Sequence, residues 1–178
     1  MKTKVADLEF EKLIDQATIQ KRITEIAAHL NEDYAGRNPI FIGVLNGSFL
    51  FVADLIKQIT IPCEVTFTKL ASYYGGTATS GKIREEIDLV VDIKDRHVII
   101  MEDIVDTGNT LNYLVEKLYL RKPASIKVCS LLLKPLSIEI SVEELEYVGF
   151  QIENDFVVGY GLDYKEQGRN LLDIYKKA

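Results

Sequence analysis

Residues 98–110 join an apolar run to three acidic side chains and a short polar loop, in the order VIIMEDIVDTGNT. Carboxylates beside the end of a buried strand are costly unless a cation or a hydroxyl-bearing ligand interacts with them. A Thr-Gly-Asn-Thr loop that begins a helix presents free backbone N–H groups, which together with the helix dipole favour a bound phosphate. The stretch therefore predicts a site for a phosphorylated sugar, in which the acids hold ribose hydroxyls and a metal.

A simpler interpretation of the same stretch is a parallel strand followed by a capped helix, with Asp106 as the N-terminal capping acid. However, the order of residues resembles the 5-phosphoribosyl-1-diphosphate (PRPP) motif of the type I phosphoribosyltransferases. That motif consists of hydrophobic residues, two acids, a gap and then Asp-Thr-Gly-x-Thr. Glu102-Asp103 and residues 106–110 match it in full.

This resemblance implies a role for each part of the motif. Glu102 and Asp103 would hold the ribose hydroxyls or the metal and its waters, and Asp106 would be the catalytic base that accepts a proton from N7 of a purine. Residues 107–110 would surround the 5-phosphate. The residues implied to bind PRPP or nucleotide phosphates are Glu102, Asp103, Ile104, Val105, Thr107, Gly108, Asn109 and Thr110.

Lys134 ends the apolar run SLLLK and is followed by Pro135. A lysine in this position can simply extend its ammonium group into solvent. The run also resembles the base-binding lysine segment of the purine members of the family. By that resemblance Lys134 donates a hydrogen bond to the exocyclic O6 of the purine.

The segment 156–169 resembles the purine-binding segment of the hypoxanthine-guanine members. The resemblance implies that Phe156 stacks on the base and that the backbone of Val157 reads its edge. It also implies that Asp163 lies beside the metal or the amino side of the base, and that Arg169 reaches the diphosphate. The alternative is an edge strand followed by a solvated Asp and Arg.

Two further segments are candidates for contacts with the diphosphate. Asn46-Gly47 forms a strand-to-helix turn that can offer backbone N–H groups to it, or is a plain turn. The family commonly carries a basic residue where this chain has Asn46, so help from a side-chain cation would be lost. Residues 71–82, with Ser72-Tyr73, resemble the flexible loop of the family and are expected to be a lid, the alternative being an exposed hairpin.

The elements that must position these residues follow from hydrophobic periodicity. We expect helices at 16–33, at 49–58 and from the acidic motif to just before Pro123, and strands at 40–45, 63–70, 84–92, 97–104, 125–132, 147–152 and 156–159. This alternation predicts an open, largely parallel α/β sheet flanked by helices, with ligands beyond the carboxyl ends of its strands. The resemblance implies the type I phosphoribosyltransferase fold over a single domain, 1–178, with a small hood from the chain ends.

The composition narrows the class of protein. The chain has 178 residues, of which 47% are hydrophobic, and a net charge of −6, which disfavours a nonspecific nucleic-acid binder. No apolar run reaches the roughly 20 residues of a membrane helix, and the first residues lack a secretory signal, so we expect a cytoplasmic protein. Cys63 and Cys129 are expected to be buried thiols, and His29 and His97 have no metal-ligand spacing.

The activity implied by the resemblance is purine salvage. A 5-phosphoribosyl group would pass from PRPP to N9 of hypoxanthine or guanine, with Mg²⁺ as cofactor, giving IMP or GMP and diphosphate. Adenine suits Lys134 poorly because its 6-amino group donates where O6 accepts, whereas xanthine stays open. The alternatives are an RNA-binding regulator of the same fold, which the acidic charge disfavours, and a noncatalytic binding domain, which the complete set of acids disfavours. A homodimer or homotetramer is implied by the resemblance alone.

Overall fold

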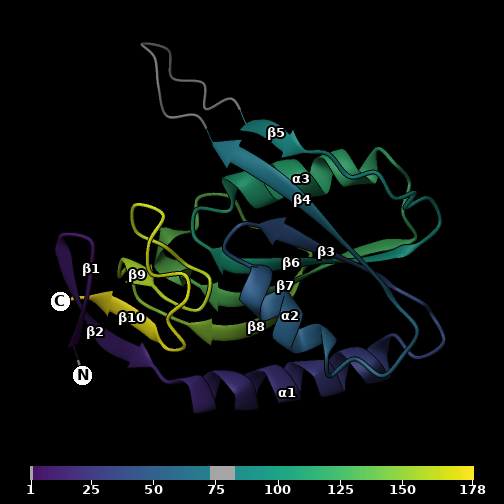
Figure 1. The fold of residues 1–178 in the computed structure, drawn as a ribbon. Coiled ribbons are helices and arrows are strands. Elements are labelled where there is room, and N and C mark those ends of the chain that lie inside the picture. The colour runs from purple at the N-terminus through teal and green to yellow at the C-terminus, as the bar shows by residue number, and fades with distance from the viewer. Residues whose placement is uncertain (1, 73–82) are drawn as a thin grey trace, which may run out of the picture.

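The computed structural model describes residues 2–72 and 83–178, whose strands form two sheets (Figure 1). The larger sheet has six strands in the order β5-β4-β3-β6-β7-β8. Its strands are β3 (Ile40–Leu45), β4 (Glu64–Ser72), β5 (Ile83–Ile87), β6 (His97–Val105), β7 (Ser125–Leu133) and β8 (Leu145–Gln151). All neighbouring pairs are parallel except β4 and β5. The predicted largely parallel open sheet is therefore confirmed.

The smaller sheet joins the two ends of the chain and forms the implied hood. It is antiparallel, with the order β1-β2-β10-β9. Its strands are β1 (Lys2–Val5), β2 (Leu8–Ile14), β9 (Val157–Val158) and β10 (Ile174–Lys177). Figure 1 shows this sheet beyond the carboxyl ends of β6, β7 and β8, which is the edge where ligands are expected.

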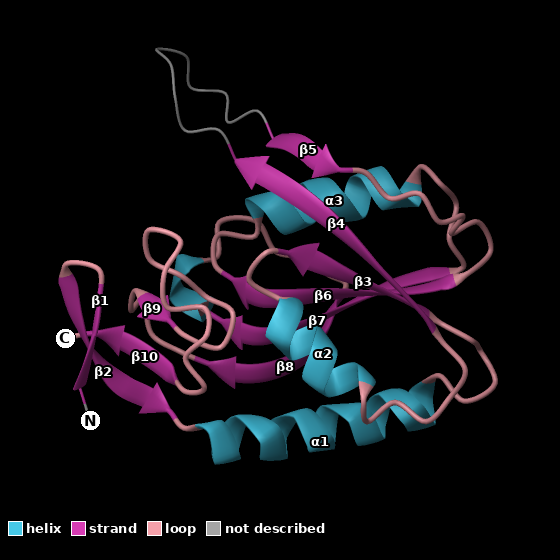
Figure 2. Ribbon diagram, in the orientation of Figure 1, coloured by secondary structure: helices cyan, strands magenta, loops and turns pink. Residues whose placement is uncertain are grey.

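Helices cover both faces of the large sheet (Figure 2). They are α1 (Gln16–Asp33), α2 (Phe49–Ile56), α3 (Asn109–Tyr119) and a 3₁₀ turn at Pro135–Ser137. Phe41 and Ile99 pack on the side of α1 and α2, whereas Ile42 and Ile100 pack with α3, because successive strand residues point to opposite faces. Among the helices of the described residues, none has both the length and the apolarity needed to cross a membrane.

The expected strand at 84–92 is wrong in its second half, because β5 ends at Ile87. Beyond that point, the carboxylate of Asp88 accepts a hydrogen bond from the N–H of Leu89 at 2.8 Å. The guanidinium of Arg121 donates to the carbonyls of Leu89 and Val91. These side-chain bonds occupy backbone groups that a further strand pairing would need.

The two cysteines are free thiols, as predicted. Cys129 is fully buried in β7, and burial raises the pKa of its thiol, whereas Cys63 is only partly buried. Nδ1 of His97 lies 2.7 Å from the hydroxyl oxygen of Ser125. This hydrogen bond between β6 and β7 gives His97 a structural role.

Candidate functional site

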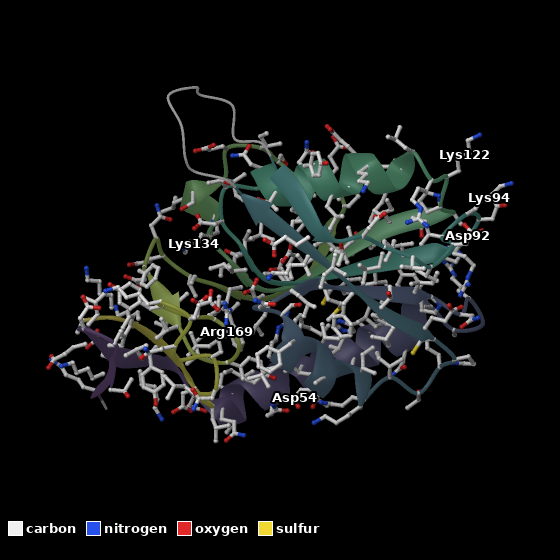
Figure 3. All side chains as sticks on the ribbon, turned by 45° about the horizontal axis from the view of Figure 1, so that its top comes forward. Asp54, Asp92, Lys94, Lys122, Lys134 and Arg169 are labelled. Atoms are coloured by element: carbon white, nitrogen blue, oxygen red, sulfur yellow. The ribbon has the colours of Figure 1, made fainter. Side chains whose placement is uncertain are left out.

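The sheet brings the expected site residues to one edge. β3 and β6 are parallel neighbours, with Gly43 paired to Met101, so the turn after β3 lies beside the end of β6. β6 and β7 are paired up to Val105 and Leu133. Figure 3 shows Lys134 and Arg169 at the hood end of the molecule, away from the labelled side chains of Asp92, Lys94 and Lys122 at the other end.

Glu102 and Asp103 are held in β6 at high electrostatic cost. Glu102 is only 7% exposed, and burial, followed by the charge of Asp103, raises its pKa well above the ordinary value. Burial also raises the pKa of Asp103 to about 6, although the N–H of Ile104 and the charge of Arg169 act in the opposite direction. Carboxylates with raised pKa values at a sheet edge are typical of a site that binds a cation or performs proton transfer.

Three segments meet closely at Asp103. A Cβ atom added at Gly47 would lie 1.5 Å from Oδ2 of Asp103, so the turn after β3 can approach the acid only with glycine. A Cβ atom at Gly161, whose φ is +100°, would in turn lie 2.0 Å from the carbonyl oxygen of Gly47. Asn46, which follows a cis peptide bond, is exposed beside this contact.

The loop after β6 turns sharply into α3. Gly108 precedes α3 with φ +86°, and the carbonyl of Thr107 accepts hydrogen bonds from the N–H groups of Glu139 and Ile140. Asn109 is exposed, and its amide donates to Glu139. Next to the loop is a pocket of about 110 Å³. It is lined by Glu102, Ile104, Val105, Asp106, Thr107, Gly108, Thr110 and Leu111.

Asp106 is not the helix cap that the simpler interpretation required, because Gly108 occupies that position. Its Oδ2 atom instead lies 2.9 Å from Nζ of Lys134. Lys134 is 8% exposed, so the alternative in which its ammonium extends into solvent is wrong. The two side chains expected to contact the purine are therefore in contact with each other.

The segment 156–169 belongs to the hood. Phe156 is 45% exposed, and the ring of Tyr164 packs edge-on against its ring, with 5.7 Å between the two ring centroids. Val157 is buried and pairs with Lys176 across β9 and β10. The strand is at the edge of its sheet, as the alternative expected, and it leaves much of the ring of Phe156 accessible for stacking.

Asp163 and Arg169 are paired rather than solvated. Nη2 of Arg169 lies 2.9 Å from Oδ1 of Asp163 and 3.2 Å from Oε2 of Glu166. Nη1 of Arg169 donates to the carbonyl of Gly161 at 2.9 Å. This arrangement fixes the guanidinium beside the turn that touches Gly47 and Asp103.

The expected lid falls largely outside the described residues. Ser72 ends β4, and its backbone pairs with Ile83. Tyr73 and the remainder of the segment up to residue 82 are not described.

One close contact at the candidate site escaped the sequence reasoning. Gly161 forms the junction between the hood and the sheet, and the only sequence signal for it is the triplet Gly159-Tyr160-Gly161. All three residues have positive φ values. Glycines on both sides of an aromatic residue indicate a tight turn, but they do not identify the partner of that turn.

The residues expected to bind metal do not form a complete protein site. Within residues 2–72 and 83–178, no three His, Cys, Asp or Glu side chains are grouped as metal ligands. Glu102 and Asp103 are adjacent hard oxygen donors, whereas Asp163 is bound to Arg169. Magnesium is usually bound through one or two carboxylates together with substrate oxygens, so these two acids fit such an ion.

Comparison with known proteins agrees with this geometry. The phosphoribosyl transferase domain family matches residues 10–165. A hypoxanthine-guanine phosphoribosyltransferase of Streptococcus pneumoniae is 46% identical over 159 residues, covering 89% of this chain and 88% of the relative. A hypoxanthine phosphoribosyltransferase of Haemophilus influenzae is 44% identical over 162 residues, covering 89% and 90%.

Solved structures lead to the same family. A crystal structure of a hypoxanthine-guanine phosphoribosyltransferase from Bacillus anthracis superposes with a TM-score of 0.88 at 39% identity, covering 93% of this chain and 97% of that one. A hypoxanthine phosphoribosyltransferase from Staphylococcus aureus gives a TM-score of 0.89 at 40% identity, covering 94% and 91%. The chain therefore belongs to the phosphoribosyltransferase family, among its hypoxanthine and hypoxanthine-guanine enzymes.

Proposed function

We propose that this enzyme transfers the 5-phosphoribosyl group of PRPP to N9 of hypoxanthine or guanine, giving IMP or GMP and diphosphate. The observation that carries the proposal is the contact between Lys134 and Asp106 at 2.9 Å, beside the pocket of the phosphate loop. A buried cation and a carboxylate next to a phosphate pocket suit a 6-oxopurine nucleotide. The names of the relatives support the same reaction.

PRPP would lie along the end of β6. Its 5-phosphate would occupy the pocket beside 107–110, where the N-terminus of α3 favours an anion. The ribose hydroxyls would face Glu102 and Asp103. The diphosphate would lie toward Gly47 and Arg169, whose planar guanidinium suits phosphate oxygens. Ser72 and Tyr73 remain part of this proposal as diphosphate contacts from the lid.

The purine would bind between the hood and the end of β7. Lys134 would leave Asp106 to donate to O6, and the exposed ring of Phe156 would stack on the base. The backbone of Val157 would read the edge of the base, and Asp163 would lie near its 2-position. Guanine and xanthine differ at that position, so Asp163 is the residue to test for their discrimination.

In the proposed step, N9 forms a bond to C1′ of the ribose as the bond from C1′ to the diphosphate oxygen breaks. The electron pair of the broken bond leaves with diphosphate, and the proton on N7 moves to the carboxylate of Asp106. Positive charge grows on the ribose during this exchange. Ionised Glu102 and Asp103 stabilise that charge.

The reaction of this family needs a divalent metal, and we propose Mg²⁺ held by Glu102 and Asp103. Burial raises the pKa of both carboxyls, so a cation beside them would supply the positive charge that keeps them ionised. When bound, Mg²⁺ neutralises diphosphate and so improves it as a leaving group.

We also propose that residues 1–178 act as one domain and form a homodimer or homotetramer. Light scattering during gel filtration will measure the oligomeric state.

A turnover assay tests the proposed reaction. Purified protein is given PRPP and Mg²⁺ with hypoxanthine, guanine, xanthine or adenine in separate reactions, and nucleotide formation is followed. We expect IMP and GMP to form and adenine to remain unchanged. The absence of product with both 6-oxopurines, or a reaction confined to adenine, contradicts the proposal.

A further inference from the structure

Tyr160 lies outside the proposed contacts with substrate, yet it belongs to a polar network centred on Asp54. Its side chain is buried, at 3% exposure, and its hydroxyl donates to Oδ2 of Asp54 on α2 at 2.6 Å. The amide of Gln20 on α1 donates to the same oxygen at 2.6 Å, and Lys57 binds the other oxygen of Asp54. Asp54 thus ties the hood to both helices on one face of the sheet.

The backbone at Tyr160 is in a conformation that side chains rarely adopt. Its φ is +49°, between Gly159 at +97° and Gly161 at +100°. A non-glycine residue in this region persists only when its surroundings hold it there. The hydrogen bond from its hydroxyl to Asp54 and the bond from its N–H to the carbonyl of Leu171, at 2.8 Å, provide that restraint.

Gly161, the residue after Tyr160, holds in place the two protein groups that are proposed to contact diphosphate, namely Arg169 and the turn at Gly47. The N–H of Gly161 donates to the carbonyl of Arg169 at 2.9 Å, and its own carbonyl accepts from the guanidinium of Arg169 at the same distance. Gly161 also packs directly against the carbonyl of Gly47. A shift of Tyr160 would therefore move Arg169 and the turn at Gly47 together.

We infer that Tyr160, held by Asp54, is a positioning residue for the diphosphate part of the PRPP site. The inference rests on the proposed function, which places diphosphate between Gly47 and Arg169. Lys134, by contrast, follows β7 and is fixed by the parallel sheet. Loss of the Tyr160 hydroxyl should consequently weaken PRPP and diphosphate binding but leave recognition of the base unchanged.

The test is Tyr160→Phe, with Tyr147→Phe as a matched control. Tyr147 also donates to an aspartate, Asp33, at 2.6 Å, but near the amino-terminal end of β8 and the carboxyl-terminal end of α1. Both variants lose one Tyr–Asp hydrogen bond, and both should lower the melting temperature. We expect only Tyr160→Phe to raise the KM for PRPP, by about tenfold, while its kcat and KM for hypoxanthine stay near wild type.

Calorimetric titration of Mg²⁺-PRPP and of Mg²⁺-diphosphate separates this inference from the proposed reaction. A wild-type protein that binds both but forms no nucleotide contradicts the reaction alone, and the Kd values of the variants then decide the role of Tyr160. Asp54→Asn provides a second variant, which should weaken PRPP binding in the same way and add little to Tyr160→Phe when combined with it. Equal PRPP affinity in wild type and Tyr160→Phe, an equal loss in Tyr147→Phe, or no binding of PRPP to wild type overturns the inference.

Discussion

Two ion pairs of equal length lie at the candidate site, and they are built in different ways. Lys134 and Asp106 follow neighbouring parallel strands, so the register of the sheet sets their separation. Arg169 and Asp163 belong to the irregular segment between β9 and β10 and depend on the turn at Gly161. The first pair is positioned by secondary structure and the second by tertiary contacts. We expect the first pair to control the chemistry and the recognition of O6 of the base, and Arg169 of the second pair to control the binding of PRPP.

Asp106→Asn should break the first pair with the largest effect. An amide cannot take the proton from N7, so kcat should fall about 10²–10⁴-fold, the range of a positioned general base. The KM for PRPP should stay near wild type because the phosphate loop keeps its backbone. Steady-state kinetics measure both values, with the exposed Asp88→Asn as control. An unchanged kcat removes Asp106 from this role.

Arg169→Lys tests the second pair at constant charge. A lysine cannot reproduce the forked bonds to Asp163 and Gly161. The KM for PRPP should therefore rise about 10–100-fold, the loss expected for hydrogen bonds to charged groups, with little change in the KM for hypoxanthine. Glu166→Gln is the matched control, since it alters only the exposed partner of the guanidinium. A rise confined to the KM for hypoxanthine would reverse the assignment of the two pairs.

Lys134→Ala tests the part of the first pair that is proposed to bind the base. Removal of the ammonium should raise the KM for hypoxanthine and guanine about tenfold or more. It should also reduce the discrimination against adenine, because the group that matches O6 is gone. Lys127→Ala, which removes a half-buried lysine of the same strand that pairs with Glu146 away from the site, is the control. Competition between hypoxanthine and adenine measures the preference, and an unaltered preference discredits the contact with O6.

The parts of the site that belong to the sheet were predictable from the sequence. The apolar run before Glu102 identifies a buried strand, and the glycine of the phosphate loop identifies the turn after it. Parallel strands place their carboxyl ends at one edge, which brings Lys134 and Gly47 to the acidic motif. These signals are local, or follow from a general rule for α/β sheets.

The parts that depend on contacts between distant segments were not predictable in this way. The end of β5 at Ile87 reflects the bonds of Arg121 to the following loop, which no local pattern reveals. The link from Asp54 to Tyr160 joins residues 106 positions apart. The hood was expected only through the family resemblance, because its strands come from the two ends of the chain and no local pattern reveals that they pair with one another.

Asp103 shares its motif with Asp106 and interacts electrostatically with Arg169 and Asp163, and pH provides the mildest test of this acid. Burial raises its pKa from 3.8 to about 6 in the folded chain, so between these values the folded state holds a proton that the unfolded state has lost. Its contribution to stability is thus complete below the unfolded pKa and is lost as the pH rises through about 6. Without metal, the melting temperature of Asp103→Asn should therefore gain roughly a few degrees on wild type between pH 4 and 7.

Asp103→Asn also removes the negative charge that helps to raise the pKa of Glu102. Because this repulsion between the two carboxylates is lost, the gain in stability of the variant increases further. Mg²⁺ with PRPP should reduce the difference at neutral pH, because a bound cation stabilises the ionised carboxylates of wild type. Differential scanning fluorimetry across the pH range measures the effect. Asp88→Asn is a control of opposite sign, because the hydrogen bond from the N–H of Leu89 lowers the pKa of Asp88, so this variant should lose stability relative to wild type as the pH rises. A difference in melting temperature that is constant with pH would show that Asp103 titrates as an ordinary surface acid. In that case the close approach of Gly47 to Asp103 would reflect packing alone, and the proposal that Asp103 binds a cation would lose its electrostatic support.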